Sequence, residues 1–163
     1  MKNIIICGFM GSGKTVVGKE LAKIMGCRFV DTDELIEKEQ GIAVKAIFAA
    51  RGEDYFRELE KEACKKIGET KNCVVSTGGG TLIFKENVDA VKKSGKVVFL
   101  DASFDTICAR IGESTSRPLF QDREKAFELY NERREKYLEA ADYVVDGNNS
   151  ARKTALDIAS VFK

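Results

Sequence analysis

The stretch GFMGSGKT occupies residues 8–15 and directly follows a short apolar run, NIIIC, at residues 3–7. It matches the pattern GxxxxGK[ST], in which the backbone amides of a glycine-rich loop surround phosphate oxygens. Gly11 and Gly13 leave room for this close approach because they carry no Cβ. A helix that begins near Lys14 would add the positive end of its dipole. The order of strand, loop and helix therefore predicts a phosphate-binding loop (P-loop) at the start of an α/β domain.

The last two residues of the loop indicate which phosphate compound it binds. In this motif Lys14 reaches the β- and γ-phosphates of a nucleotide, and the hydroxyl of Thr15 ligates Mg²⁺. Gly11, Ser12 and Gly13 would supply amides around the phosphates. We expect ATP or GTP together with Mg²⁺. The alternative is a glycine-rich turn between a strand and a helix that binds no ligand.

Four more runs share the short, β-branched character of residues 3–7, which is typical of parallel strands covered on both faces. They lie at residues 27–31, 73–77, 96–101 and 143–146. Apolar residues at helical spacing occur at residues 17–24, 104–111, 124–141 and 155–162. Alternation of strands and helices predicts an α/β protein with right-handed crossovers. We expect a three-layer fold, with a five-stranded parallel sheet flanked by helices.

Two segments interrupt this alternation. Residues 33–60 have helical character and contain no strand, and residues 112–123 are polar and hold the only proline of the chain. Insertions of this kind often handle substrates or close over them. A chain of 163 residues is expected to form one domain. We therefore expect a single domain, 1–163, with a substrate-binding insert at 33–60 and a lid at 112–123.

The balance of charges excludes several classes of partner. Lys and Arg number 27 against 26 Asp and Glu, so the chain is not the strongly basic protein that nucleic-acid binding favours. No apolar run approaches the ~20 residues that span a bilayer. We expect a cytoplasmic protein that binds neither nucleic acid nor membrane.

The missing residue types narrow the chemistry further. Histidine is absent, which removes the Ser-His-Asp and Cys-His kinds of catalytic site. The five cysteines are scattered without a CxxC pair, so they predict neither a disulfide framework nor a zinc site. Phosphoryl transfer suits the remaining groups because it depends on positioning and charge stabilisation more than on a strong base.

Two further motifs follow predicted strands, where doubly wound sheets bind their ligands. Asp31 and Asp33 flank Thr32 at the end of the second strand, and their carboxylates could serve a magnesium shell and a substrate hydroxyl. Three glycines, 78–80, follow the third strand and permit close approach of a ligand to the backbone. Each motif has a plainer alternative: a helix cap at Thr32 or Asp33, and a flexible turn at the glycines.

Arginine forks match carboxylates and phosphates, and four arginines stand near these motifs. They are Arg57, Arg117, Arg133 and Arg134. A solvated surface position is the default for any arginine. Their positions in the chain do not by themselves identify any of the four as a ligand-binding residue.

In combination, these motifs resemble those of shikimate kinases. The matching segments are GFMGSGKT at 8–15, DTD at 31–33, IFAARGEDYFRELE at 47–60, STGGG at 76–80, RPL at 117–119 and RREKY at 133–137. Many nucleotide-binding enzymes share the P-loop, whereas the other motifs in this order are specific. The resemblance runs over nearly the whole chain. It implies transfer of the γ-phosphoryl group of ATP to the 3-hydroxyl of shikimate.

The resemblance also implies roles for single residues around the phosphoryl group. Asp33 would hydrogen-bond the attacking hydroxyl and accept its proton. Lys14 and Arg117, the latter on the lid, would stabilise charge on the phosphoryl group. Asp31 would hold the magnesium shell together with Thr15.

Other residues would bind the acceptor and the nucleotide. Arg57 and Arg133 would hold the shikimate carboxylate between them, since a planar anion suits two guanidinium groups. Gly79, together with Gly80, would offer backbone amides to the ring hydroxyls. Arg110 would contact the nucleotide.

Two assignments involve a choice between neighbours or between roles. Arg133 is preferred to Arg134 because the arginine of the family is followed four residues later by tyrosine, and Tyr137 fits that spacing. Phe48 and Phe56 fit apolar walls for the carbocycle or plain core positions.

Two alternative functions remain at this stage. One is another small-metabolite kinase of the same architecture, such as a gluconate kinase, which the P-loop cannot distinguish. The other is a nucleotide-binding regulatory protein that transfers nothing. The paired arginines and the TGGG motif favour shikimate, and we expect the enzyme to be a monomer.

Overall fold

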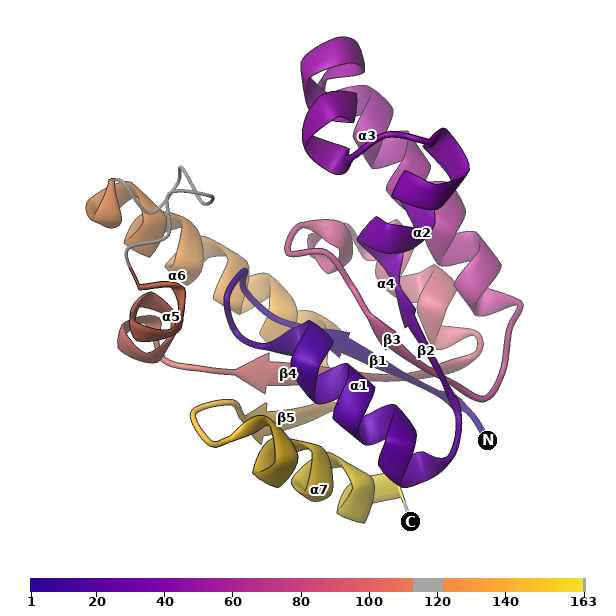
Figure 1. Cartoon of the computed structure of the whole chain (residues 1–163), viewed down its shortest axis with the longest axis vertical. Helices are drawn as coiled ribbons and strands as arrows, with labels where there is room; N and C mark the ends of the chain where they lie inside the picture. The colour runs from indigo at the N-terminus through magenta and orange to yellow at the C-terminus, as the bar shows by residue number, and fades with distance from the viewer. Residues whose placement is uncertain (113–121, 163) are drawn as a thin grey trace.

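The computed structural model describes residues 1–112 and 122–162 of the chain. Its elements are β1 (Asn3–Cys7), α1 (Lys14–Met25), β2 (Arg28–Asp31), α2 (Thr32–Gln40), α3 (Val44–Gly68), β3 (Cys73–Ser76), the 3₁₀ helix η1 (Thr81–Ile83), α4 (Lys85–Lys92), β4 (Gly95–Asp101), α5 (Phe104–Ile111), α6 (Arg123–Ala140), β5 (Tyr143–Asp146) and α7 (Ala151–Phe162). The strands form one parallel sheet in the order β2-β3-β1-β4-β5. Helices cover both faces of the sheet (Figure 1), so the predicted three-layer α/β fold is confirmed.

The strand predictions agree with the structure to within one residue at each end. The helices agree less well. Helix α4 was not predicted, because its sequence KENVDAVK offers only Val88, Ala90 and Val91 as an apolar stripe. In α6, within the predicted helix 124–141, the buried residues are Ala126, Tyr130, Tyr137 and Ala140, whereas the apolar Phe127 is 47% exposed.

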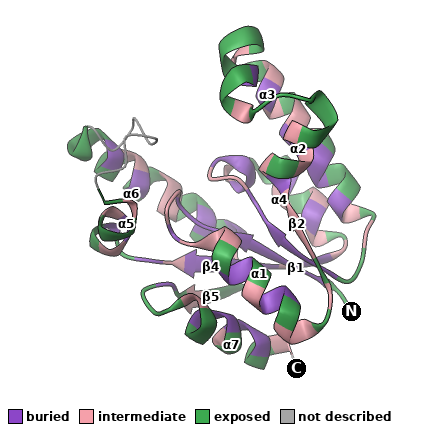
Figure 2. Cartoon of the chain, in the orientation of Figure 1, coloured by how far each residue is buried: buried purple, intermediate pink, exposed green. Residues whose placement is uncertain are grey.

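The central strand β1 supplies two separate cores with alternate side chains. Ile4 and Ile6 pack with α1 and α7 on one face of the sheet. Ile5 and Cys7 pack with α3, α4 and α6 on the other face. Figure 2 shows the central strands β1, β3 and β4 buried and the helices buried mainly along the side that faces the sheet, whereas the edge strands β2 and β5 are partly exposed. The two-sided burial of the central strands explains why they read as continuous apolar runs.

The strand order brings three sequence motifs together. All strands are parallel, so their carboxyl ends lie at one edge of the sheet. The P-loop follows β1, Asp31 ends β2, and the glycines 78–80 follow β3. Because β3 lies between β2 and β1, these three segments are neighbours at that edge.

Helix α2 and α3 as far as residue 60 form an arm, residues 32–60, that projects from the sheet on the side of β2 (Figure 1). We call it the α2–α3 arm. Ile36, Ile47 and Phe56 of the arm form a separate apolar cluster, which Ala63 completes further along α3. Gly52 interrupts α3 with φ 84° and ψ 173°, a conformation that favours glycine. The arm contains the helices expected for the insert at 33–60.

Asn3 connects β1 to the α3–β3 and α4–β4 junctions at the opposite edge of the sheet. Its side chain is fully buried, and its Nδ2 donates to the carbonyl oxygen of Ile67 at 3.2 Å and to Ser94 Oγ at 3.0 Å. Its Oδ1 accepts a hydrogen bond from the backbone amide of Cys73 at 2.9 Å. One buried amide therefore pairs the backbone of Cys73 and links the segments that precede β3 and β4.

The lengths of the helices and the state of the cysteines bear on the expectations about membranes and disulfides. No helix within residues 1–112 and 122–162 is long and apolar enough to cross a membrane. All five cysteines are free thiols, and Cys7, Cys64 and Cys73 are buried. Burial raises the pKa of Cys64 to about 12, so this thiol stays protonated and unreactive.

Candidate active site

The P-loop has the geometry of a phosphate cradle. Gly11 and Gly13 have φ values of 81° and 96°, and Gly13 caps the start of α1 from the left-handed region. A Cβ on Gly11 would lie 2.6 Å from Cδ1 of Ile111, so the loop packs tightly under α5. The hydroxyl of Ser12 is buried and has no hydrogen-bond partner within the described part of the chain. A loop with an orphaned buried hydroxyl and two glycines at positive φ fits a phosphate ligand.

Lys14 lies over this loop. Its Nζ donates to the carbonyl oxygens of Gly8 at 2.7 Å and of Phe9 at 3.1 Å. The ammonium group is thus held at the mouth of the cradle by the loop backbone. From this place the ammonium group can exchange the two carbonyl oxygens for phosphate oxygens when a nucleotide binds.

Arg110 joins the P-loop to the loop after β5. Its Nη1 donates to the carbonyl oxygen of Ser12 at 2.8 Å, and its Nη2 donates to that of Asn149 at 2.9 Å. The guanidinium lies 3.7 Å from the position that a Cβ on Gly13 would occupy. The structure therefore places Arg110 beside the phosphate cradle, where the sequence predicted a nucleotide contact.

A cavity of about 560 Å³ opens over the P-loop. Its lining brings together most of the residues predicted from the sequence: Gly11, Gly13, Lys14, Thr15, Asp31, Asp33, Gly79 and Arg110. Ser76, Thr77 and Gly78 complete the side formed by β3 and its loop. The nucleotide motif and the proposed base thus share one cavity. Arg117 lies outside the described residues, as does most of the predicted lid.

A hydroxyl and a carboxylate form a possible magnesium position. Thr15 Oγ1 donates to Asp31 Oδ2 at 3.1 Å. Asp31 Oδ1 accepts from the backbone amides of Asp33 at 2.9 Å and Glu34 at 3.1 Å, so Asp31 caps α2. The alternative that Thr32 or Asp33 is the cap is therefore wrong.

One hydroxyl and one carboxylate fit Mg²⁺, and they are too few for a metal ion that is coordinated by protein groups alone. Among the residues described, no group of three or more His, Cys, Asp or Glu side chains could hold a metal ion. Magnesium is usually held by one or two protein oxygens, several waters and substrate phosphates. Thr15 and Asp31 beside a phosphate loop supply that kind of site.

Asp33 is the titratable group best suited to act as a base. Burial, followed by the carboxylates of Asp31 and Glu60, raises the pKa of Asp33 from 3.8 to about 6, although Lys14 lowers it. Its Oδ1 lies 2.7 Å from the position that a Cβ on Gly78 would occupy. A carboxylate with a pKa close to neutral can accept a proton effectively in catalysis.

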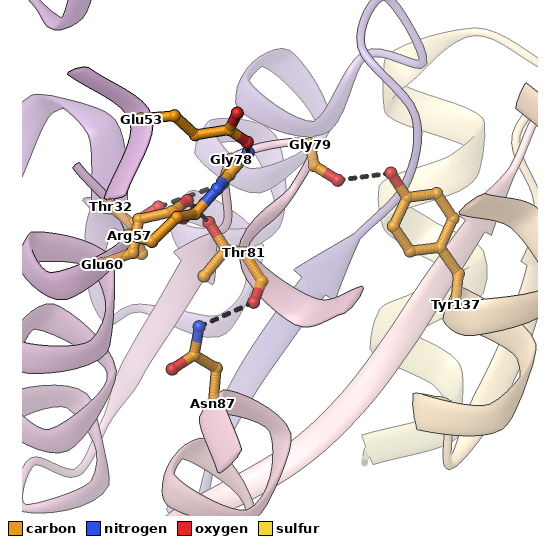
Figure 3. Close-up of polar contacts among 9 residues, drawn as sticks. All are labelled: Thr32, Glu53, Arg57, Glu60, Gly78, Gly79, Thr81, Asn87 and Tyr137. Atoms are coloured by element: carbon orange, nitrogen blue, oxygen red, sulfur yellow. Dashed lines mark hydrogen bonds and ion pairs between the residues drawn. The ribbon is translucent and has the colours of Figure 1, made fainter. Parts of the chain in front are cut away.

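Arg57 lies at the base of the α2–α3 arm and is held by acidic neighbours. Its Nη1 donates to Glu60 Oε1 at 2.5 Å and its Nη2 to Glu53 Oε1 at 3.3 Å. Glu60 is only 1% exposed, and its second oxygen accepts from Thr81 Oγ1 (Figure 3). Glu60 therefore links Arg57 to the loop after β3. No role was assigned to Glu60 from the sequence, although its i, i+3 spacing from Arg57 was a usable signal.

The structure distinguishes the two adjacent arginines of α6. Arg134 forms a two-point ion pair with Asp101, with Nε to Oδ1 at 3.1 Å and Nη2 to Oδ2 at 2.7 Å. Arg133 instead faces the glycine loop, and its Nη1 lies 3.4 Å from the position of a Cβ on Gly79. Successive residues on a helix point about 100° apart, which separates the two side chains.

Arg57 and Arg133 flank the glycine loop. The guanidinium of Arg57 lies 2.7 Å from the position of a Cβ on Gly80, while that of Arg133 lies near Gly79. Both Nε atoms are buried without a hydrogen-bond partner in the part of the chain that the structure describes. Two cations with buried unpaired donors on either side of one loop can hold an anion there.

Comparison with known proteins gives the family. A family model described as shikimate kinase matches residues 10–163. The chain belongs to the shikimate kinase family. A shikimate kinase of Caldanaerobacter subterraneus subsp. tengcongensis is 43% identical over 148 residues, which cover 90% of this chain and 86% of that protein. A solved structure described as shikimate kinase from Acinetobacter baumannii in complex with shikimate has a TM-score of 0.92 at 33% identity, covering 99% of this chain and 93% of that one.

The shikimate kinase family settles the broad chemistry. Shikimate kinases are ATP-dependent phosphotransferases that use Mg²⁺, so the predictions of an enzyme, of ATP and of Mg²⁺ are confirmed. A gluconokinase from Sinorhizobium meliloti is also similar in structure, with a TM-score of 0.57 at 19% identity. That likeness shows the shared fold alone. Neither the gluconate kinase nor the regulatory alternative has the support that the shikimate kinase match has.

The two phenylalanines expected near the shikimate kinase acceptor have different surroundings. Phe56 is 3% exposed and belongs to the apolar cluster of the α2–α3 arm. Phe48 is 36% exposed, and its ring centroid lies 4.8 Å from that of Phe56. Phe56 is therefore a core residue of the arm, while Phe48 covers it from outside.

Proposed function

We propose that this chain transfers the γ-phosphoryl group of ATP to the 3-hydroxyl of shikimate and releases shikimate 3-phosphate and ADP. The observation that carries the proposal is the position of Asp33. Its carboxylate shares one cavity with Lys14 of the P-loop and lies beside the glycine loop that two arginines flank. The solved structure that this chain resembles is described as a complex with shikimate.

The nucleotide side of the reaction uses the P-loop. The amides of Gly11, Ser12 and Gly13 bind phosphate oxygens, and Lys14 neutralises their charge. Thr15 and Asp31 would hold Mg²⁺, which lowers the charge repulsion between the phosphates and the attacking oxygen when it is bound.

The acceptor side uses residues outside the P-loop. Arg57 and Arg133 bind the shikimate carboxylate and thereby fix the ring in the cavity. The amides of Gly79 and Gly80 bind ring hydroxyls. Asp33 accepts the proton of the 3-hydroxyl while the oxygen of that hydroxyl attacks the γ-phosphorus. The bond between the γ-phosphorus and the oxygen that bridges it to the β-phosphate breaks, and ADP leaves.

The lid belongs to the same proposal. Arg117 would stabilise charge on the transferred group, and closure of residues 112–123 would exclude water and limit hydrolysis of ATP. We further propose that the chain works as a single-domain monomer in the cytoplasm. Size-exclusion chromatography with light scattering tests the monomer directly, and a dimer mass would contradict it.

A coupled assay of ADP formation tests the proposed function. Purified protein with ATP and Mg²⁺ is expected to form ADP rapidly only when shikimate is added, with one shikimate 3-phosphate formed per ADP. A panel of hydroxy acids that includes gluconate serves as the control. Stimulation by gluconate and not by shikimate would establish the rival assignment.

A further inference from the structure

The glycine loop 78–80 is held in place by other elements. Three consecutive glycines have the widest backbone freedom of any tripeptide, so contacts from outside must fix their conformation. The amide of Gly78 donates to Thr32 Oγ1 at 3.0 Å, and the hydroxyl of Tyr137 donates to the carbonyl oxygen of Gly79 at 2.5 Å (Figure 3). Helices α2 and α6 therefore restrain the loop from two sides.

Tyr137 is a rigid donor. Its side chain is 1% exposed, and its ring packs against Phe99 with centroids 5.3 Å apart. Burial raises the pKa of Tyr137, so the phenol remains protonated, while the nearby Arg133 acts in the opposite direction. A carbonyl oxygen can only accept, so the one phenolic proton lies in the hydrogen bond to Gly79.

This hydrogen bond also sets the direction of the next amide. The described residues contain no cis peptide bond, so the carbonyl of Gly79 and the N–H of Gly80 point to opposite sides of one planar peptide. Since the carbonyl points at Tyr137, the N–H of Gly80 points away from it. Arg57 lies on that opposite side of the loop (Figure 3).

We infer that Tyr137 is a positioning residue for the acceptor, which turns the Gly79–Gly80 peptide so that the N–H of Gly80 faces the shikimate ring. The inference rests on the proposed function and deepens it. Tyr137 follows Arg133 by four residues, so both lie on one face of α6. On that face, the guanidinium of Arg133 binds the shikimate carboxylate, and the hydroxyl of Tyr137 orients the amide of Gly80.

Tyr137→Phe removes only the hydroxyl and tests this role. The expected result is a rise of about five- to tenfold in KM for shikimate, the effect of one lost hydrogen bond, with KM for ATP unchanged. Tyr130→Phe is the matched control. Tyr130 lies on the same helix and is 9% exposed, and its hydroxyl donates a hydrogen bond to the carbonyl oxygen of Ala102 at 2.8 Å. This control is expected to lose comparable thermal stability while KM for shikimate stays at the wild-type value.

A second measurement needs no variant. In wild-type protein labelled with ¹⁵N-glycine, addition of shikimate is expected to shift the Gly80 amide signal downfield and to slow its exchange with solvent. The assignment of Tyr137 is overturned if KM for shikimate is unchanged in Tyr137→Phe, if Tyr130→Phe raises it equally, or if the Gly80 amide does not respond. Wild-type protein that does not phosphorylate shikimate overturns the proposed function itself, and the positioning role with it.

Discussion

As the proposed general base, Asp33 is expected to set how the reaction responds to pH. Its pKa of about 6 lies above the ordinary 3.8 because of burial and the carboxylates of Asp31 and Glu60. A base must be deprotonated, so kcat/KM for shikimate is expected to fall tenfold per pH unit below about pH 6. Glu60→Gln removes one of the charges that raise the pKa and is expected to move this fall to lower pH. An unmoved profile would show that the acid limb belongs to another group.

The same residue predicts a conflict between stability and activity. The folded chain binds a proton at Asp33 more tightly than the unfolded chain, so this group's contribution to stability decreases as pH rises from 3.8 to about 6. Asp33→Asn removes the buried charge. We expect the variant to be more stable than wild type at pH 7.5 by about 1–3 kcal/mol, and nearly equal to it at pH 3.5.

Urea unfolding at the two pH values measures this difference. The activity of Asp33→Asn is expected to be at least a hundredfold lower in kcat, while ATP still binds. A variant that is less stable than wild type at pH 7.5 would contradict the electrostatic account of Asp33.

The adjacent arginines of α6 offer a matched pair of substitutions. Arg133→Ala is expected to weaken shikimate binding by about 2–4 kcal/mol, because one partner of the bound carboxylate is lost. Arg134→Ala breaks an ion pair with Asp101 away from the glycine loop and is expected to leave shikimate affinity unchanged. Calorimetric titration of both variants with shikimate decides between them, and the reverse order of effects would exchange their roles.

At the scale of the elements, Asn3 shows how the strands are fixed at the edge away from the active site. Asn3→Ala leaves the buried amide of Cys73 without its acceptor, whereas the carbonyl of Ile67 keeps the hydroxyls of Thr70 and Ser94 as donors. We expect a loss of about 1–3 kcal/mol in the free energy of unfolding, with both KM values unchanged. Lys2→Ala, at the exposed neighbouring position, is the control and should change stability by less than about 0.5 kcal/mol.

The central strands were predictable because burial on both faces leaves a continuous apolar run in the sequence, as at residues 3–7, which coincide with β1. The edge strand β5 is mostly exposed, and it was predictable from the β-branched run at 143–146. Helix α4 was missed because eight residues with a narrow apolar stripe carry little periodic signal. The break at Gly52 was missed because a single glycine inside a helical pattern does not reveal its φ value.

The site was predictable only in part for a similar reason. Motifs revealed Asp33 and Lys14 because their residue types and spacing recur with the chemistry. The contact between Tyr137 and Gly79 spans 58 positions of the chain, and no local pattern encodes such a distance. The role of Glu60 likewise depends on Thr81, which the fold and not the sequence brings beside it.

At the scale of the whole molecule, the α2–α3 arm is the part expected to respond most to the acceptor. It lies outside the two sheet cores, so its amides should open at lower free energy than those of β1 and β3. We expect shikimate to slow hydrogen exchange of residues 44–60, because Arg57 holds the shikimate carboxylate in the proposed complex. Hydrogen exchange with ATP alone is the control and should protect residues 8–15 instead. If shikimate and ATP each protected residues 44–60 and residues 8–15 equally, the assignment of the arm to the acceptor and of the P-loop to the nucleotide would be contradicted.

The separate apolar cluster of the arm has a consequence for how such enzymes can diverge. Ile36, Ile47, Phe56 and Ala63 belong to neither sheet core. Mutations that reshape the arm can therefore accumulate without loosening the sheet that carries the P-loop. In evolutionary terms the arm, which carries Asp33 and Arg57, can change its shape while the P-loop keeps its support from the sheet, and a new acceptor would further require changes at Arg133 on α6.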